Sequence, residues 1–536
     1  MELRNYQKEC CNKVINAWLR GERKQVISLP TGSGKTVIMG KLISHFVNKR
    51  KFQCLVITHL RELIDQTAKK FSKWFGKENV GVEMSESGAN NEIIVVGSIQ
   101  TLYRRALEPR FDLVCIDECH HAPNKTYLDV LERLGYYAKL PESKLLLGFT
   151  ATTKRSDNVG LDTIFSEITY HKNILEMIEL GWLVDIKGYT VKTTTDLTML
   201  GSSQSDFNQK QLKRITANDD RMKAIIDAYK TKIEGKKTII FVAGIDNVEK
   251  LAQMFQDEGI EAEAIHSKLN KTIRTEKLEA YRDSRLKIVI NDGVLTEGFD
   301  DPSTEAIILG KPTKSNLRFI QMIGRGLRPN EGKECCHVID ICDISGQHSL
   351  CTVPTIIGLP PKIEMEGDSL MEVKEQLKDK ELKLGFTNTS KLKDLVYKPI
   401  SFLTQEMPYE LVNLTKLAWS KMIDNSYVLN FNGNKYTLRE DLLGRVKGTI
   451  VIKGDWLTGL KFASLKEAFK EFDKKIIADF PKKTILLRSD KTWRHEPASV
   501  KQIELLHNLG YDGNHSISKS YASLKIEELL EARQYA

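Results

Sequence analysis

Short runs of β-branched and other apolar residues alternate with longer segments of helical period along the first part of the chain. These runs are Val26–Ser28, Leu55–Thr58, Ile93–Val96, Leu113–Asp117 and Leu145–Phe149. Segments of helical period, such as Leu60–Phe75, separate them. The alternation is typical of β-α-β units, so we expect a parallel sheet in this part of the protein.

The same pattern is repeated further along the chain. The second set of runs is Thr238–Val242, Ala262–His266, Ile288–Asn291, Ala306–Leu309 and Val338–Ile341. A second parallel-sheet lobe is therefore expected. Between the two sets, the Thr-, Ser- and Gly-rich segment Thr193–Gln209 predicts a linker or a mobile loop.

The pattern changes after Leu359. Pro360-Pro361 and the charged helical stretch Leu370–Leu384 predict a connector. Short alternating runs follow between positions 419 and 452, with Asn432-Gly433-Asn434 as a hairpin signal between two of them. We expect a small β-rich region there.

Two helices are expected in the last part of the chain, at Ser464–Ile476 and at Ser499–Leu509, where Gly510 ends the second. We therefore divide the chain into five parts. They are a first lobe (1–190), an interlobe linker with a second lobe (191–358), a connector (359–415), a β-rich and helical accessory domain (416–480), and a basic segment with a small helical tail module (481–536).

Composition agrees with several domains, because 536 residues are too many for one hydrophobic core. The net charge of +9 suits a polyanionic partner, although such a balance is also common in proteins that never bind nucleic acid. No apolar run approaches the roughly 18 residues of a membrane span, and Met1–Gln7 has no apolar signal core. We therefore expect a cytoplasmic protein whose nine cysteines are reduced thiols.

Four cysteines and two histidines of the second lobe suggest a zinc site. They are Cys335, Cys336, Cys342, Cys351, His337 and His348. Their spacing lacks a Cys-x2-Cys knuckle, and Cys335–Asp340 has the pattern of a buried strand. We interpret these cysteines as structural thiols.

A glycine-rich segment, Leu29–Thr36, follows the first apolar run and precedes a helical pattern. Glycines leave backbone N–H groups free to surround a phosphate, and the following helix N-terminus adds a favourable dipole. We predict a P-loop in which Lys35 reaches the β- and γ-phosphates and the Thr36 hydroxyl binds Mg²⁺. The predicted ATP-binding residues of this loop are Thr31, Gly32, Ser33, Gly34, Lys35 and Thr36. The strict pattern has glycine where this chain has Leu29.

The apolar run Leu113–Asp117 leads into two adjacent carboxylates, Asp117 and Glu118. A lone pair of this kind is usually a solvated turn, but a P-loop upstream favours a catalytic interpretation. We expect Asp117 to hold Mg²⁺ through water and Glu118 to polarise the attacking water as general base.

Arg325 and Arg328 are three residues apart, a spacing that would place both on one face of a helix. A guanidinium group donates two parallel hydrogen bonds to phosphate and stays charged. We predict that both arginines contact the γ-phosphate, and either could be the main finger.

The segment Asp117–His120 resembles motif II of the superfamily 2 helicases in its DECH form. Other segments resemble the remaining motifs of that family in order: Arg4–Gln7 (Q motif), Thr58–Leu63 (Ia), Gly97–Thr101 (Ib), Gly148–Thr152 (III), Ile240–Val242 followed by Ala264–Ser267 (IV), Leu295–Asp300 (V) and Gln321–Arg328 (VI). The resemblance covers about residues 1–345. It implies an α/β fold with two tandem RecA-like lobes, followed here by the small β-rich region and the helical tail module.

The resemblance also implies ATP and Mg²⁺ as cofactors and assigns roles to further residues. Those expected to bind ATP are Arg4, Gln7, Gly298, Asp300 and Gln321. Those expected to couple the motifs are His120, Thr150 and Thr152. Those expected to contact nucleic acid are Thr58, Arg61, Gly97, Ser98, Gln100, Thr101, His266 and Thr296.

The P-loop belongs to the first expected lobe and the two arginines to the second, and an ATP site shared in this way couples ATP hydrolysis to movement of the lobes. If the second lobe supplies arginine only when the cleft closes, closure depends on the nucleotide state. A strand lying across both lobes would then be gripped differently in each state. Contacts to phosphates and sugars would make that grip largely independent of sequence.

The two-lobe core, the DECH box and the motif V form Thr296–Asp300 resemble bacterial RadD-type and phage-borne DNA helicases. That family is associated with recombination, repair and replication-fork processing. Its cysteine-rich zinc tail is absent here, and Thr153 stands where many relatives have proline. We expect a DNA helicase or translocase acting on single-stranded, forked or branched DNA. An RNA helicase and a translocase subunit of a nuclease or antiviral complex are the alternatives.

The last segment gives two interpretations. Pro497–Leu506 is similar to a short tail module of some phage and bacterial DNA-processing proteins. Basic residues surround Trp493, namely Lys482, Lys483, Arg488, Lys491 and Arg494. They could bind nucleic acid by charge and stacking, or form a solvated linker before a helix that docks a protein partner.

Overall fold

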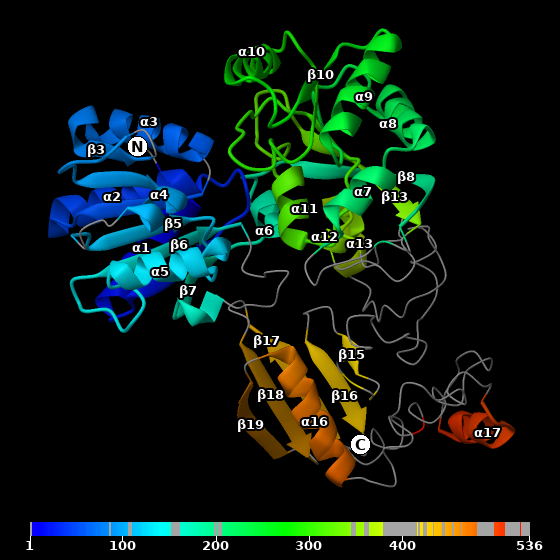
Figure 1. The fold of residues 1–536 in the computed structure, drawn as a ribbon. Coiled ribbons are helices and arrows are strands. Elements are labelled where there is room, and N and C mark those ends of the chain that lie inside the picture. The colour runs from blue at the N-terminus through cyan, green and yellow to red at the C-terminus, as the bar shows by residue number, and fades with distance from the viewer. Residues whose placement is uncertain are drawn as a thin grey trace. The chain divides into compact units, whose positions relative to one another are not determined.

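The computed structural model divides the chain into two compact units (Figure 1). Unit 1 contains residues 1–357 and 365–372 together with the short segment 442–444, and unit 2 contains the rest. The structure describes residues 3–59, 61–84, 87–105, 110–151, 161–197, 200, 206–344, 350–357, 364–378, 415, 417, 419–421, 426–431, 434–441, 445–452, 455–462, 464–479, 498–509 and 526.

The first lobe of unit 1 is built on a seven-stranded parallel sheet with the order β3-β4-β2-β5-β6-β1-β7. Its strands are β1 (Lys24–Ser28), β2 (Cys54–Thr58), β3 (Val80–Glu83), β4 (Ile94–Ser98), β5 (Leu113–Asp117), β6 (Leu145–Thr150) and β7 (Glu167–His171). Most strand side chains are buried, as expected of a parallel sheet covered on both faces.

The helices of the first lobe precede, connect and follow these parallel strands. They are α1 (Asn5–Leu19), α2 (Lys35–Arg50), α3 (Arg61–Phe75), α4 (Ile99–Arg104), α5 (Lys125–Arg133) and α6 (Ile174–Glu179), with 3-10 turns η1 (Lys77–Asn79), η2 (Cys119–His121) and η3 (Leu161–Thr163). In a parallel sheet the carboxyl ends of all strands lie at the same edge. The segments that follow β1, β5 and β6 therefore lie near one another, and they carry the predicted motifs I, II and III.

The second lobe of unit 1 contains another seven-stranded sheet, in the order β10-β11-β9-β12-β13-β8-β14. Its strands are β8 (Asp185–Asp196), β9 (Thr238–Phe241), β10 (Ala262–Ile265), β11 (Ile288–Asn291), β12 (Ala306–Leu309), β13 (Cys335–Ile344) and β14 (Glu366–Ser369). Only β14 is antiparallel to its neighbour among these described strands. The helices are α7 (Gln209–Ile215), α8 (Asp219–Lys232), α9 (Ile245–Asp257), α10 (Lys271–Arg282), α11 (Asn316–Ile323) and α12 (Val353–Ile356). Helix α13 (Leu370–Lys378) begins in unit 1 and belongs to unit 2 from Val373.

Part of the predicted linker is a strand. β8 continues to Asp196 and pairs along its length with β13, so residues 193–196 belong to the second sheet. Thr193, Thr194 and Thr195 are β-branched, which favours a paired strand over a loop once a neighbouring strand is present. The linker prediction was therefore wrong over these residues, because the sequence does not show that β13 lies beside them.

The beginning of the predicted connector also belongs to the second lobe. β14 forms the edge of the second sheet, and Met365 packs so closely on Gly188 that a Cβ there would lie 2.6 Å from its sulfur atom. Met365 and Leu370 are buried. Residues 379–414 of the connector lie outside the described part of the chain.

Unit 2 contains a five-stranded antiparallel sheet and a long helix. Its elements are β15 (Ser420–Lys421), β16 (Tyr427–Phe431), β17 (Asn434–Glu440), β18 (Val446–Ile452), β19 (Asp455–Phe462), α16 (Leu465–Asp479) and α17 (Val500–Asn508). In Figure 1, α16 lies along one face of this sheet. Its Phe469 and Phe472 pack against Trp419, and Ile476 joins the same core. The predicted fold class is confirmed, with two parallel-sheet lobes, a small antiparallel sheet and accessory helices.

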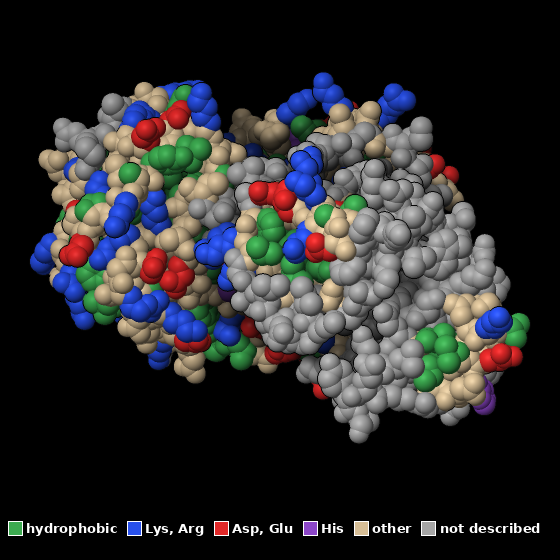
Figure 2. All heavy atoms as spheres, turned by 90° about the horizontal axis from the view of Figure 1, so that it is seen from below, with side chains coloured by type: hydrophobic (Ala, Val, Ile, Leu, Met, Phe, Trp, Pro, Cys, Tyr) green, Lys and Arg blue, Asp and Glu red, His purple; other side chains and the backbone are tan. Residues whose placement is uncertain are grey.

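None of the helices in the described part of the chain is long and apolar enough to cross a lipid bilayer. Figure 2 shows that basic side chains on the visible face of the first lobe lie among acidic ones. The basic segment that contains Lys482, Lys483, Arg488, Lys491, Trp493 and Arg494 lies outside the described residues.

Candidate active site

The P-loop turns sharply between β1 and α2. Gly32 and Gly34 have positive φ angles of +88° and +76°, a region that residues with a side chain rarely adopt. A Cβ added at Gly34 would lie 2.7 Å from Nε2 of Gln7. Lys35 begins α2, and its Nζ donates to the Leu29 carbonyl at 3.2 Å. The loop therefore has the backbone that a phosphate cradle requires.

The two carboxylates follow β5 directly. Glu118 has φ +49° and ψ +53°, a left-handed conformation that is strained for a residue other than glycine. Its backbone N–H donates to Oδ1 of Asp117 at 3.1 Å. Such strain tends to persist where the surrounding structure fixes the orientation of a functional side chain.

Their environments separate the pKa values of the two carboxyl groups. Burial and the neighbouring charge of Glu118 raise the pKa of Asp117 to about 6. Burial alone would raise the pKa of Glu118, but Lys35 and His120 outweigh it and lower that pKa. Oε1 of Glu118 lies 3.9 Å from Nζ of Lys35. Glu118 therefore stays ionised beside the P-loop lysine.

A histidine connects motif II to motif III. Nδ1 of His120 lies 3.3 Å from Oε2 of Glu118 and 3.2 Å from Oγ1 of Thr150, at the end of β6. Both His120 and Thr150 are buried. This arrangement joins the carboxylate strand β5 to the neighbouring strand β6. Thr152, predicted to take part in the same coupling, lies outside the described residues.

The two motif VI arginines do not share a helical face. α11 ends at Ile323, and Gly324 caps it, so Arg325 and Arg328 both lie beyond the helix. The prediction of one helical face was wrong because spacing alone does not show where a helix ends. Both side chains nevertheless contact motif V, and Arg328 also lies against Gly32 of the P-loop.

Arg325 is buried, and its Nε donates to the Thr296 carbonyl at 3.0 Å. It also donates to the Phe299 carbonyl. Burial lowers the pKa of Arg325 and of Arg328 to about 10, so both remain charged near neutral pH. Arg328 forms an ion pair with Asp300 of motif V.

The second lobe reaches the P-loop itself. A Cβ at Gly32 would lie 3.0 Å from Cγ of Arg328, and one at Gly324 would lie 2.7 Å from Cβ of Thr31. Thr31 is buried, and its Oγ1 has no hydrogen-bond partner among the described residues. Motifs I and VI therefore meet at one place, where a buried hydroxyl group is left for a further partner.

The predicted adenine motif lies against the same loop. Oε1 of Gln7 accepts from the Arg4 backbone N–H at 3.0 Å, and its Nε2 lies 3.3 Å from the Ser33 carbonyl. The hydroxyl group of Tyr6 also donates to Ser33. The Arg4 guanidinium lies 5.0 Å from the ring centre of Trp182. Sequence reasoning missed Tyr6 and Trp182, because Trp182 follows α6, far from any motif, and only the fold brings it to Arg4.

A contact between the lobes was also missed. Nε2 of His59, which precedes α3, lies 2.8 Å from Oε2 of Glu297 in motif V. Nε2 of Gln321 donates to the other oxygen of Glu297 at 2.9 Å. Nearby, Nε2 of Gln66 donates to the Gly298 carbonyl at 2.8 Å. Motif V is therefore held by motif VI on one side and by the first lobe on the other.

His59, His121 and Glu297 also bring three potential metal-ligand atoms within 4.8 Å of one another. Nε2 of His59 already forms the hydrogen bond to Glu297, which accounts for the position of that pair. Burial lowers the pKa of His121 to about 3, with the charges of His120 and His59 acting in the same direction. We therefore interpret this group as a hydrogen-bonded contact between the lobes.

The predicted nucleic-acid residues of motifs Ia and Ib are brought together. Oγ of Ser98 lies 2.6 Å from Oε1 of Gln100, whose Nε2 donates to the His59 carbonyl at 3.3 Å. Arg61 is exposed, whereas Thr58 and Thr101 are buried.

The structure also describes the remaining residues that were predicted to contact nucleic acid. Gly97 is part of β4, and a Cβ there would lie 3.1 Å from Leu102. His266 is buried and lies 3.1 Å from Glu249, and Thr296 is half-buried. The nucleic-acid role of all these residues stays a prediction.

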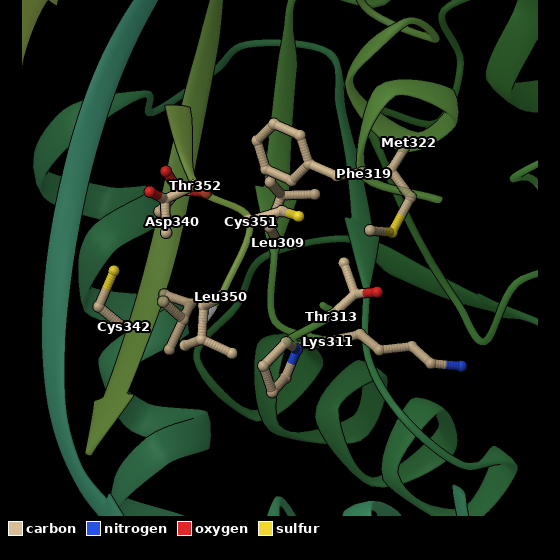
Figure 3. Close-up of a pocket in the computed structure, with 12 residues that line it drawn as sticks. Leu309, Lys311, Thr313, Phe319, Met322, Asp340, Cys342, Leu350, Cys351 and Thr352 are labelled. Atoms are coloured by element: carbon tan, nitrogen blue, oxygen red, sulfur yellow. The ribbon is translucent and has the colours of Figure 1, made fainter. Parts of the chain in front are cut away.

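A small cavity lies inside the second lobe, where Met322 of motif VI forms part of its lining (Figure 3). Its volume of about 10 Å³ leaves room for about one water molecule, which excludes a nucleotide. Asp340 of β13 lies at its wall, where it accepts from the Val353 backbone N–H at 2.7 Å, and burial raises its pKa to about 7. Cys342 and Cys351 also line the cavity, whereas Cys335 lies 3.7 Å from Nε2 of His337.

The residues present suit ATP and Mg²⁺. The left-handed glycines, the N-terminus of α2 and the buried Thr31 hydroxyl provide donors for phosphate oxygens. Asp117 and Thr36 offer the carboxylate and hydroxyl oxygen atoms that Mg²⁺ prefers. Arg325 and Arg328 supply positive charge from the second lobe.

Comparisons with known proteins agree with this geometry. Residues 1–155 match the family described as type III restriction enzyme, res subunit, and residues 220–330 match the helicase conserved C-terminal domain. The "Putative mitochondrial ATP-dependent helicase irc3" of Schizosaccharomyces pombe is 31% identical over 94% of this chain and 86% of that protein. The "DNA 3'-5' translocase XPB2" of Sulfurisphaera tokodaii is 26% identical over 62% of this chain and 80% of that protein.

One solved structure shows the same fold. A fragment of a putative HsdR subunit of a type I restriction enzyme from Vibrio vulnificus has a TM-score of 0.52 and 22% identity, and the match covers 67% of each chain. The first family match includes the P-loop and the two carboxylates, and the second includes the motif VI arginines. The alignment with the fission yeast protein covers most of this chain. The chain therefore belongs to the superfamily 2 helicases and is an ATP hydrolase.

Proposed function

We propose that this protein is an ATP-dependent DNA helicase or translocase, which couples ATP hydrolysis to movement on DNA or to its remodelling in recombination, repair or replication. The observation that carries the proposal is the meeting of two lobes at one site. Arg328 and Gly324 of the second lobe lie against Gly32 and Thr31 of the P-loop. A site completed by both lobes changes the relation between them whenever its ligand changes.

The chain's own residues account for the chemistry of hydrolysis. Lys35 and the P-loop N–H groups bind and orient the phosphates. Glu118, ionised and fixed in a strained backbone, accepts a proton from the attacking water. Arg325 and Arg328 stabilise the negative charge that develops on the transferred phosphoryl group. Mg²⁺, held through Asp117 and Thr36, would supply further charge neutralisation when bound.

Adenine recognition would use the motif that packs on the P-loop. Gln7 has its carboxamide between the Arg4 backbone and Ser33, so adenine would contact the group that already touches the phosphate loop. We further propose that Arg4, whose guanidinium lies 5.0 Å from the ring centre of Trp182, forms with that indole one wall of the base site. In this proposal a group that recognises the base is hydrogen-bonded directly to the loop that binds the phosphates.

The choice of DNA rests on the relatives. The Sulfurisphaera relative is named as a DNA translocase, and the basic net charge of +9 of this chain suits a polyanion. The exposed Arg61 and the Ser98–Gln100 pair at the ends of β2 and β4 are the residues that we propose contact the strand. The predicted cytoplasmic location stays a prediction, and the name of the fission yeast relative describes a mitochondrial protein.

ATPase stimulation tests the proposal directly. Steady-state hydrolysis would be measured with single-stranded DNA, forked DNA, duplex DNA and single-stranded RNA of matched length. We expect DNA to stimulate turnover more than RNA does. Equal or greater stimulation by RNA would favour an RNA helicase instead, and no stimulation by any nucleic acid would favour a subunit that needs a protein partner.

Lys35→Ala provides the control for the chemistry, because it removes the charge at the β- and γ-phosphates. We expect its ATP turnover to fall by at least about 100-fold while DNA binding survives. Lys41→Ala, which changes an exposed lysine on the same helix α2, should keep normal turnover. Near-normal ATPase in a folded Lys35→Ala protein would contradict the P-loop assignment.

A further inference from the structure

A hydrogen-bonded path leads from motif Ib to the backbone of His59. Gln100 is exposed in the first turn of α4, and its Oε1 lies 2.6 Å from Oγ of Ser98. Nε2 of Gln100 donates to the His59 carbonyl at 3.3 Å. The two segments are adjacent because β2 and β4 are parallel neighbours, with Thr58 opposite Ser98. The residues that we propose contact the strand are therefore bonded to the backbone of His59.

The side chain of His59 extends this path into the second lobe. Its Nε2 lies 2.8 Å from Oε2 of Glu297, and Oε1 of Glu297 accepts from Nε2 of Gln321. The His59 and Glu297 side chains are only 19% and 18% exposed. A hydrogen bond that involves a charged group is stronger where water is largely excluded. The His59–Glu297 bond is therefore stronger than a comparable bond on an open surface.

The segment that carries Glu297 also orients a catalytic arginine. Nε of Arg325 donates to the carbonyl of Thr296, the residue before Glu297, at 3.0 Å. A second nitrogen atom of Arg325 donates to the Phe299 carbonyl. A shift of Glu297 would move the Thr296 carbonyl, because both belong to one planar peptide unit. The position of Glu297 therefore affects the direction of the Arg325 guanidinium.

A second contact attaches the same segment to the first lobe by another route. Nε2 of Gln66 donates to the carbonyl of Gly298, which lies in sequence between Thr296 and Phe299. Gln66 lies within α3, whereas Gln100 contacts the segment before that helix. Comparison of the two contacts therefore separates simple attachment of the lobes from a link to the strand-binding residues.

We propose that His59 is a positioning residue through which bound DNA accelerates ATP hydrolysis. A strand bound at Ser98 and Gln100 fixes the His59 backbone. The imidazole then holds Glu297 in the position from which Arg325 reaches the γ-phosphate. His59 itself touches neither ligand, so its effect is on the rate of turnover. This inference rests on the proposed function and assigns His59 a role in it.

The test uses two amides of different length in the full chain. His59→Gln keeps an N–H donor at about the reach of the imidazole Nε2, whereas the amide of His59→Asn is one carbon shorter. ATP turnover would be measured without DNA and with saturating single-stranded DNA, and the ratio of the two rates compared. We expect this ratio to fall roughly tenfold in His59→Asn and to stay within about twofold of wild type in His59→Gln.

The two ligand affinities separate positioning from binding. The KM for ATP and the DNA concentration that gives half-maximal stimulation should keep their wild-type values in His59→Asn. In a Glu297→Ala background, His59→Asn should cause no further fall in the ratio, since the partner of the bond is already absent. A fall accounted for by weaker DNA binding, or a full further fall in that background, would contradict the proposed path.

Gln66→Ala is the matched control, because it removes the other contact between the first lobe and motif V. It should change the rates with and without DNA by the same factor, which leaves the ratio unchanged. An unchanged ratio in His59→Asn, or an equal fall in His59→Gln or in Gln66→Ala, would overturn the role of His59. Wild-type turnover that DNA does not stimulate would refute the proposed function instead.

Discussion

Glu118 combines a strained left-handed backbone, a buried side chain and a carboxyl group whose pKa is lowered by Lys35 and His120. Backbone strain and burial of a charge each cost free energy, and together these features hold the ionised Glu118 carboxylate in one orientation. Asp117, one residue earlier, has its pKa raised to about 6. Two adjacent carboxyl groups with opposite shifts are suited to different tasks, one as a base and one as a metal ligand.

At the residue scale, we predict that Glu118→Gln binds ATP and Mg²⁺ but hydrolyses ATP about 10²–10⁴-fold more slowly. The amide has nearly the same shape but cannot accept the proton of the water. The variant should therefore remain closed on ATP and hold DNA more tightly with ATP than without it. Single-turnover hydrolysis and DNA affinity with and without ATP would be measured.

Glu132→Gln, an exposed change on α5, serves as the control and should behave like wild type. If the DNA affinity of Glu118→Gln were the same with and without ATP, closure of the lobes on ATP would not be coupled to DNA binding. If its hydrolysis were normal, another residue would be the base.

At the element scale, the contact between the segment before α3 and motif V joins elements that are remote in sequence. Burial alone would lower the pKa of His59, but the hydrogen bond and charge of Glu297 outweigh it and raise the pKa. Burial would raise the pKa of Glu297, but the hydrogen bond from His59 outweighs it and lowers the pKa. The pH range in which His59 and Glu297 are both charged is therefore wider than it would be if the two groups did not interact.

We predict that this pair stabilises unit 1 in a defined pH window. The raised pKa of His59 means that its contribution is full below its usual value of 6.5 and is lost as pH rises through the folded value. The lowered pKa of Glu297 means that its contribution is full above 4.5 and is lost as pH falls through the folded value. The stabilisation should be greatest between these two values.

The measurement is the unfolding free energy of wild type minus that of His59→Gln across pH. We expect a difference of about 1 kcal/mol near pH 5.5 that shrinks toward pH 8.5. His45→Gln, which changes a half-buried histidine of α2, should show no such window. A difference that grew with rising pH would contradict the ion pair.

At the scale of the whole molecule, the boundary of the ATPase core lies later than the sequence pattern suggests. The sequence predicts that both sheets end before Leu359, yet β14 adds an edge strand after that position. Met365 and Leu370, both buried, also lie beyond it. A cut at Leu359 would remove these contacts and leave β8 as an exposed edge.

We predict that truncation after Lys378 leaves a stable core with basal ATPase but weaker unwinding of forked DNA. This truncation removes the small antiparallel sheet and the helices that follow it. The plot of log DNA affinity against log salt concentration should therefore flatten by about one unit of slope for each phosphate contact removed. Truncation after Leu359 is the informative comparison and should unfold at a lower temperature. Identical slopes and unwinding for the full chain and the 1–378 core would instead favour a protein-docking role for unit 2.

Much of the fold and of the ATP site could be predicted because the signals are local. A glycine-rich turn after a strand requires only a few consecutive residues, as do the carboxylates Asp117 and Glu118 at the end of β5. Periodicity indicated both parallel sheets, since each strand is a contiguous apolar run. The hairpin-rich region and α16 were indicated in the same way, by alternation and by helical spacing.

Other features depend on which segments become neighbours. The membership of β8 and β14 in the second sheet, and the meeting of Arg4 with Trp182, require contacts between segments far apart in the chain. The positions of Arg325 and Arg328 depend on the point where α11 ends. Arg439, Lys447 and Lys461 become cross-strand neighbours only through the register of three strands. Sequence by itself therefore determined the chemistry of contiguous segments, whereas tertiary structure alone decided how they pair, because long-range packing rather than local propensity selects each neighbour.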